Sequence, residues 1–162
     1  MRMLVDILSS IERSGLGEAI RTTPYLYPIL MSLHVVGISI LVGPALVVDL
    51  RSLGIARKVV PVTVTTRYLL PVCHIGFAVV LCTGIAMFVA IAMAVGESPA
   101  APWKFGLIAI AGINIAVFHK GIYRTVEKWD FDASPPTPAK LAAKVSALSW
   151  TGVIFAGRFL AY

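Results

Sequence analysis

The sequence predicts an all-α integral membrane protein, a four-helix bundle with an amphipathic surface helix at its N-terminus. Hydrophobic residues make up 58% of the 162 residues, and only 14% are charged. The apolar residues form long blocks, and about 20 helical residues suffice to cross the roughly 30 Å of a bilayer core. A soluble domain of this length could not hide so much apolar surface, because it needs a polar exterior. The chain is therefore predicted to be a single membrane domain.

Residues 3–20 are predicted to form the amphipathic helix. Apolar residues such as Leu4 and Ile7 recur at helical spacing, and charged residues fall between them. A helix of this kind is expected to lie flat on the membrane surface. Ser14 and Gly15 are expected to weaken or break it, because both residues favour helix ends over helix interiors.

Four apolar stretches are predicted to span the membrane, at residues 25–49, 67–95, 103–123 and 140–161. The first begins with tyrosines suited to the interface, and Pro44 is expected to kink it in its last third. Lysines at the start of the fourth can extend their ammonium groups to the interface. Glycines recur along all four stretches, and small residues let helices approach each other closely in lipid.

The basic residues predict the orientation in the membrane. Nine of the 14 Lys and Arg lie in or beside residues 51–66 and 124–139, and five lie on the other side. By the positive-inside rule these two loops are cytoplasmic, so both termini are predicted to be periplasmic in a bacterial inner membrane. Basic residues at the ends of apolar blocks also contact anionic lipid. The sequence contains no basic patch with interleaved aromatic residues, so nucleic-acid binding is not predicted.

All three histidines, His34, His74 and His119, fall inside predicted spans. An ionisable residue in a membrane helix is costly, which makes each a candidate functional residue. At 1.5 Å per residue, His74 lies about 10 Å and His119 about 6 Å from the inner surface. His34 lies about 13 Å below the outer surface by the same measure. His74 and His119 are therefore expected at similar depth on neighbouring spans.

Two histidines at matched depth on adjacent helices predict a six-coordinate haem b, with one imidazole on each side of the iron. Arg67, Lys120 and Arg124 are expected to pair with the haem propionates. Gly112 precedes His119 on the same helix face, where the missing side chain would make room for the ring. The structural alternative is that the histidines bond each other or a backbone carbonyl.

His34 admits several roles. It could bind a second haem, either with Met87 or with a residue of a partner subunit, or it could make a polar or proton-carrying contact in the bundle core. A zinc or copper ion would need three or four converging ligands. At the end of the first span, Asp49 and Arg51 are expected to form an ordinary interfacial pair. Nothing in the sequence predicts hydrolytic catalysis.

Several segments resemble a bacterial family of small four-span membrane proteins without an assigned function. They are His34-Val-Val-Gly37, Leu41-Val42-Gly43, Asp49-Leu-Arg-Ser-Leu-Gly54, Gly112-Ile-Asn114-Ile-Ala-Val-Phe118-His119 and Gly157-Arg158-Phe-Leu-Ala-Tyr162. The resemblance covers most of the chain. More distantly, the chain is similar to membrane b-type cytochromes and copper-resistance D-type proteins. That similarity implies haem held between histidines of a four-helix bundle.

The leading functional hypothesis is a membrane-embedded b-type cytochrome that transfers electrons through bis-histidine haem. Its expected partners are a redox protein or a quinone, and no substrate site of its own is expected. The alternatives are a non-haem metal or small-solute transporter subunit and a structural membrane partner. A homo-oligomer is expected, because the glycine-rich helix faces exceed what four helices need.

Overall fold

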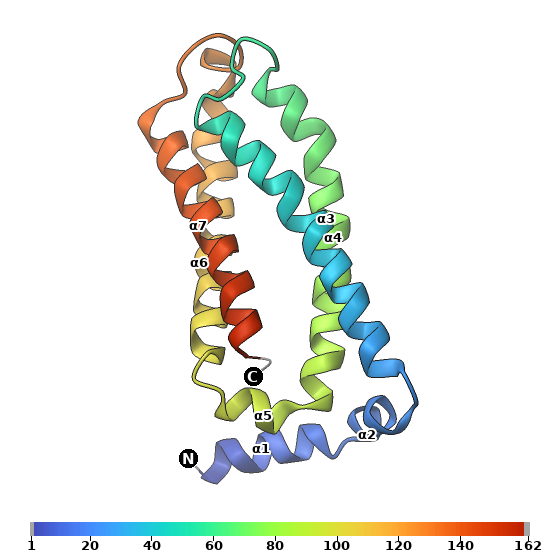
Figure 1. The fold of residues 1–162 in the computed structure, drawn as a ribbon. Helices are drawn as coiled ribbons and strands as arrows, with labels where there is room; N and C mark the ends of the chain where they lie inside the picture. The colour runs from blue at the N-terminus through green and yellow to red at the C-terminus, as the bar shows by residue number, and fades with distance from the viewer. Residues whose placement is uncertain (1, 161–162) are drawn as a thin grey trace.

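Every regular element of the described chain is helical (Figure 1). The computed structural model describes residues 2–160. The elements are, in order, α1 (Arg2–Glu12), α2 (Gly15–Thr22), α3 (Leu26–Ser52), α4 (Val62–Ala90), α5 (Ala92–Glu97), α6 (Ala101–Lys120), the 3-10 helix η1 (Ile122–Lys128) and α7 (Thr137–Phe159). No strand occurs among these residues, and the all-α prediction is confirmed.

Two helical hairpins form the bundle, α3 with α4 and α6 with α7, and α7 joins them by packing against α3. The connections at residues 53–61 and 121–136 lie together at one end, which we call the loop end (Figure 1). Helices α1, α2 and α5 lie across the opposite end, called the N-terminal end. Helices suit a membrane because each satisfies its own backbone hydrogen bonds.

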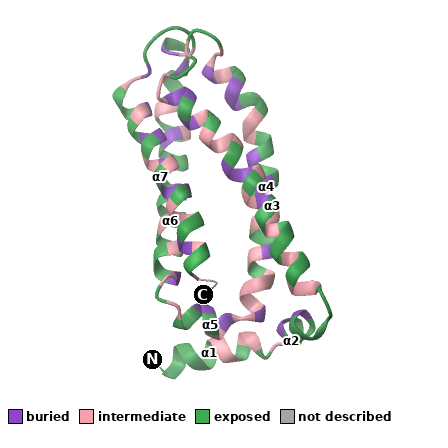
Figure 2. Cartoon of the chain, in the orientation of Figure 1, coloured by how far each residue is buried: buried purple, intermediate pink, exposed green. Residues whose placement is uncertain are grey.

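Three of the described helices, α3, α4 and α6, are long and apolar enough to cross a membrane, with 27, 29 and 20 residues. Large apolar residues are exposed along them, as expected for surfaces that face lipid. Figure 2 shows exposed positions along these helices. Helix α7 has 23 residues but carries Lys140, Lys144 and Arg158. It is not among the helices that qualify by length and composition. The structure thus supports a multi-pass membrane protein, and the crossing by α7 stays a prediction.

The helices differ from the predicted spans at several ends. Helix α4 begins at Val62 rather than at residue 67, and it ends at Ala90 rather than at residue 95. It stops because Ile91 leaves the helical region, with φ −137° and ψ 39°, and the short helix α5 follows. Helix α6 ends at Lys120 rather than at residue 123, and η1 continues from there. The predicted kink site Pro44 lies inside α3, which continues helically past it.

The N-terminal helices hold the break between α4 and α5. Arg21 Nη1 donates hydrogen bonds to the carbonyl oxygens of Ala90, at 2.8 Å, and Glu12, at 2.7 Å. The Glu12 carboxylate accepts a hydrogen bond from the backbone N–H of Met93 at 2.7 Å. A helix end leaves backbone groups without helical partners. Here two charged side chains supply those partners.

The predicted helix over residues 3–20 is divided into two helices, α1 and α2. The break follows Glu12, and the Ser14 hydroxyl accepts a hydrogen bond from the Gly17 N–H at 3.3 Å. A serine in this position starts a new helix because it satisfies a free backbone donor. Met3 and Leu4 in α1 are exposed, which leaves an apolar surface available to lipid.

Glycines bring α3 and α4 into close contact. A methyl group added at Gly76 would lie 2.5 Å from the backbone nitrogen of Leu41, and one at Gly37 would lie 2.9 Å from the Val79 side chain. The helices approach this closely because both positions lack a Cβ atom. Gly43, also in α3, has no neighbour within 4 Å of an added methyl group. Glycine-mediated helix packing is therefore confirmed at Gly76 and Gly37 but not at Gly43.

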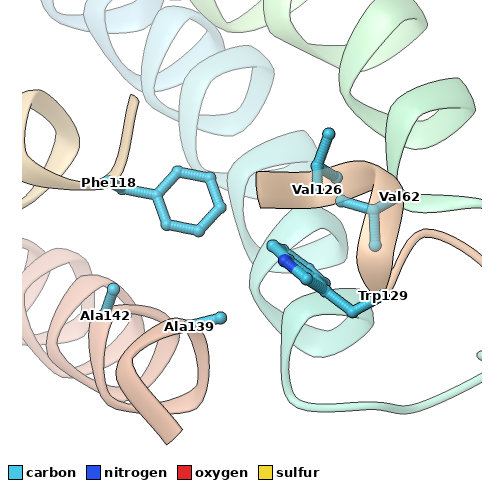
Figure 3. Packing of buried hydrophobic residues seen from close by; sticks show 6 residues of the cluster. All are labelled: Val62, Phe118, Val126, Trp129, Ala139 and Ala142. Carbon is cyan, nitrogen blue, oxygen red and sulfur yellow. The ribbon is translucent and has the colours of Figure 1, made fainter. Parts of the chain in front are cut away.

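Buried apolar residues form two clusters along the bundle. The cluster near the loop end contains Val62, Phe118, Val126, Trp129, Ala139 and Ala142 (Figure 3). The cluster farther along the bundle contains Leu41, Val42, Cys73, Ala111 and Trp150. The first cluster joins the start of α4, the end of α6 and the start of α7. It therefore fixes the relative positions of the helix ends that surround the candidate site.

Asp130, in the loop after η1, caps the start of α4. Its carboxylate accepts hydrogen bonds from the backbone N–H of Thr63 at 2.7 Å and from the Thr63 hydroxyl at 2.8 Å. Its carbonyl oxygen accepts the N–H of Val62 at 3.0 Å. The N-cap position of α4 is Pro61, which makes no side-chain cap hydrogen bond. A carboxylate distant in sequence thus does what a local Ser or Asp usually does.

We expect Asp130→Ala to lower the free energy of unfolding by about 1–2 kcal/mol, the usual effect of losing an N-cap acceptor. Alanine removes both oxygens that accept hydrogen bonds from Thr63. Glu127→Ala removes an exposed carboxylate from the neighbouring η1 and is expected to change stability little. Denaturation of both variants in detergent, followed by circular dichroism, measures the difference. Equal effects of the two substitutions would contradict the capping role.

Candidate functional site

His74 and His119 line one pocket near the loop end. Thr66, Arg67, Leu70, Pro71 and Tyr123 complete its lining. The pocket has a volume of about 260 Å³. It opens between α4 and α6, which do not pack closely against each other. The structure therefore brings together the two histidines that lie at matched depth in the sequence-based prediction.

The imidazole of His119 is oriented by its own helix. Its Nδ1 atom lies 3.0 Å from the carbonyl oxygen of Ile115. Because a carbonyl can only accept, the neutral ring carries its proton on Nδ1 and keeps a lone pair on Nε2. The ring also lies edge-on to Phe118, with centroids 5.5 Å apart, and 5.8 Å from the ring of Tyr123. An imidazole held in this way is suited to binding a metal through Nε2.

The other wall of the pocket is one face of α4. Arg67, Pro71 and His74 recur at helical spacing, so they share this face. His74 is exposed there. The Thr66 hydroxyl oxygen lies 2.8 Å from the hydroxyl oxygen of Tyr123, and this hydrogen bond joins α4 to η1 beside the pocket. The two walls are thereby fixed relative to each other at the loop end.

Three residues expected at the site do not line the pocket: Lys120, Arg124 and Gly112. Lys120 is the last residue of α6 and Arg124 lies in η1, and both are exposed. Gly112 is exposed on α6, and a methyl group added there would have no neighbour within 4 Å. Arg67 is the one of the three expected cationic residues that reaches the lining.

His34 lies apart from the pocket, in the contact between α3 and α4. Its Nδ1 atom is 2.8 Å from the Thr83 hydroxyl oxygen. A methyl group added at Gly84 would lie 3.1 Å from its Cε1 atom. Thr83 lies roughly 13 Å beyond His74 along the axis of α4, at 1.5 Å per residue. His34 therefore makes a polar contact between helices, which is one of the roles expected for it.

Four lining residues were absent from the sequence-based expectation: Thr66, Leu70, Pro71 and Tyr123. Their spacing from the two histidines along the helices could have predicted them. Thr66 and Leu70 precede His74 by about two turns and one turn of α4. Tyr123 follows His119 by about one turn, although the chain passes from α6 into η1 between them.

The lining contains the kinds of groups that a planar haem would need: two imidazoles, apolar side chains and a cation. Ligand pockets typically measure about 300–1,000 Å³, so this smaller pocket would enclose one edge of a porphyrin. The rest would lie in the opening between α4 and α6. Leu70 and Pro71 supply apolar contacts, and Arg67 supplies a cation for a carboxylate. The described residues contain no group of three or more His, Cys, Asp or Glu side chains able to hold a metal ion, as a zinc site would require.

Residues 8–162 match the model of a protein family described as a family of unknown function, DUF6644. The match extends from α1 through all the later helices and includes the three histidines. No curated protein and no solved structure matches the chain. The predicted resemblance to a family without an assigned function is confirmed by this match. The chain belongs to the DUF6644 family.

Proposed function

We propose that this chain is a membrane-embedded b-type cytochrome in which His74 and His119 hold one haem b between α4 and α6. The observation that supports this most directly is that both histidines line one pocket, while the helices that carry them stand apart. Bis-histidine ligation in a helical bundle needs this arrangement, because the ring must fit between the two imidazoles. When bound, haem would supply one-electron chemistry at its iron.

The residues of the chain would orient the cofactor and set its environment. The Ile115 carbonyl holds Nδ1 of His119 and leaves Nε2 as the ligand atom. Arg67 would pair with a propionate at the pocket, and Lys120 and Arg124 would add positive charge nearby at the loop end. With both histidines holding it, the iron would supply electron transfer, so we propose this rather than turnover of a substrate.

A quinone or a redox protein is the proposed electron partner, and it would approach the open side between α4 and α6. We also propose that the chain forms a homo-oligomer. Gly106 and Gly112 have no neighbour within 4 Å of an added methyl group, so these positions are free for close contact with a second copy. Lipid would cover the remaining exposed apolar side chains.

We propose α7 as a fourth span in a bacterial inner membrane. It packs along α6 and returns the chain to the N-terminal end (Figure 1). Lys140 and Lys144 lie in its first turns, where long side chains can reach the interface, and Arg158 lies in its last turn. The loop end is then cytoplasmic, in agreement with the positive-inside rule, and both termini are periplasmic.

An absorbance spectrum of the purified protein tests the proposal. Protein extracted in mild detergent is expected to show sharp Soret and α bands in the reduced-minus-oxidised difference spectrum, because two histidines would hold the haem. Pyridine extraction is expected to give about one haem b per chain, since one histidine pair binds one haem. Colourless protein from cells with ample haem would contradict the proposal.

One observation favours the alternative, a transporter subunit: Asp49 is buried within the bundle, and buried acids in membrane helices often lie on ion paths. Cation uptake that is lost in His34→Ala, in a protein that contains no haem, would favour this alternative. A structural membrane partner would be favoured if alanine at all three histidines left the activity of a partner complex intact.

A further inference from the structure

One acidic side chain lies in the interior of the bundle. Asp49, in α3, is 8% exposed. The other seven of the eight Asp and Glu residues are half-buried or exposed. The Ser146 side chain of α7 interacts with the Asp49 carboxyl group, and the Cys73 side chain of α4 lies within electrostatic range. The Oδ2 atom of Asp49 is buried and has no hydrogen-bond partner.

The expected interfacial pair between Asp49 and Arg51 is not formed. Arg51 is itself only 4% exposed. Its Nε atom donates to the carbonyl oxygen of Val60, and its Nη2 atom donates to the carbonyl oxygen of Asp130 at 2.6 Å. Residues two apart on a helix do not face each other, which explains why the two side chains separate. Within the described chain, Arg51 thus ties the two connections of the loop end together and does not neutralise Asp49.

An ionised carboxylate in this environment is strongly disfavoured. Burying an unpaired charge costs several kcal/mol, and a buried acid avoids that cost by taking up a proton. Ser146 and Cys73 provide no positive charge, and a metal cation would need about six oxygen ligands. No cluster of three or more His, Cys, Asp or Glu occurs among the described residues. We infer that the carboxyl group of Asp49 is a proton-binding site.

The site lies where the two hairpins of the bundle meet. The contact between α3 and α7 joins the hairpins, and the interaction of Asp49 with Ser146 crosses this contact. Loss of the proton would place a charge between α3 and α7, so water would have to enter or the helices would have to separate. Asp49 is in the last turn of α3, so the proton exchanges with water at the loop end.

Dicyclohexylcarbodiimide tests this assignment on the full-length wild-type protein in lipid vesicles. This apolar reagent reacts with protonated carboxyl groups in apolar surroundings and leaves a stable acylurea, which mass spectrometry of peptides can locate. We expect Asp49 to be labelled at least about tenfold more than the exposed Glu97 at neutral pH, and labelling to fall as the pH rises. A water-soluble carbodiimide is the control, expected to modify Glu97 and leave Asp49 intact.

The competing outcomes are distinct. Replacing choline chloride with sodium chloride is expected to leave the labelling of Asp49 unchanged, and protection by sodium would overturn the assignment in favour of a metal cation. Failure of the apolar reagent to label Asp49, or equal modification of Asp49 and Glu97 by the soluble reagent, would also overturn it. The measurement needs no variant and does not depend on whether the protein binds haem.

Discussion

Alanine in place of His119 or His74 is expected to remove the reduced-minus-oxidised haem bands from the purified protein. Each imidazole would fill one of two axial positions, and both line the same pocket. Loss of one iron ligand should lower haem affinity at least about 100-fold, because even the outer partners of metal ligands contribute 10–100-fold. The measurement is haem content per chain after pyridine extraction, compared with the wild-type protein.

His34→Ala is the matched control, because it makes the same side-chain change in another span. Its hydrogen bond to Thr83 at 2.8 Å joins α3 to α4. Its loss is expected to cost about 1 kcal/mol of stability and to leave the haem content unchanged. Imidazole added to the His119→Ala protein is expected to restore the bands. The assignment of ligands is wrong if His34→Ala loses haem while His119→Ala retains it.

Leucine in place of Gly76 is expected to prevent stable assembly of the bundle. Even a methyl group at this position would lie 2.5 Å from the Leu41 nitrogen and 2.8 Å from the carbonyl carbon of Ile40. These are backbone atoms in the middle of α3, so they cannot move aside as a flexible side chain could. Overpacking ordinarily costs about 1–3 kcal/mol, and displacement of a whole helix should cost more. We expect aggregated protein in size-exclusion chromatography of detergent extracts.

Gly43→Leu provides the comparison, because it adds the same side chain to a glycine that has no neighbour within 4 Å of an added methyl group. This variant should accumulate in the membrane and elute as the wild-type protein does. Gly76→Ala should fall between the two in thermal stability. A Gly76→Leu protein that elutes and melts like the wild type would contradict the close contact between α3 and α4.

Hydropathy predicted the helical class and the approximate spans, since lipid demands long apolar helices with internally satisfied backbones. It could not predict the break at Ile91. That break depends on hydrogen bonds from Arg21 and Glu12, which lie in other helices. The early start of α4 likewise depends on Asp130, a residue far away in sequence. Helix ends set by distant side chains leave no local signal.

The presence of His74 and His119 beside the same pocket could be predicted because the rise per residue of a helix is fixed, so sequence position gives depth. Depth says nothing about direction around the helix axis. For this reason Lys120 and Arg124 were expected at the site, although neither lines the pocket. Tyr123 was missed because it follows the end of α6, in a 3-10 turn that hydropathy does not reveal.

The interior position of Asp49 also could not be predicted from the sequence. Opposite charges close together in sequence at the end of a span suggest a surface ion pair. Spacing alone argues against a pair between Asp49 and Arg51, since they lie two residues apart on one helix. Asp49 and Ser146 lie 97 residues apart in sequence, on helices of different hairpins. Only the tertiary arrangement reveals their interaction.

Glu12 and Arg21 are synthesised well before the peptide groups of residues 90–93 that they bind. During translation the segment formed by α1 and α2 therefore lacks these hydrogen-bond partners until α4 and α5 have been synthesised. Exposed Leu4 and Leu16 give it an apolar means of staying at the bilayer. A protein shortened by this segment would still insert its apolar helices, but the Ala90 carbonyl and the Met93 amide would lack their charged partners. We therefore expect the segment to make these hydrogen bonds only after the long helices have been inserted.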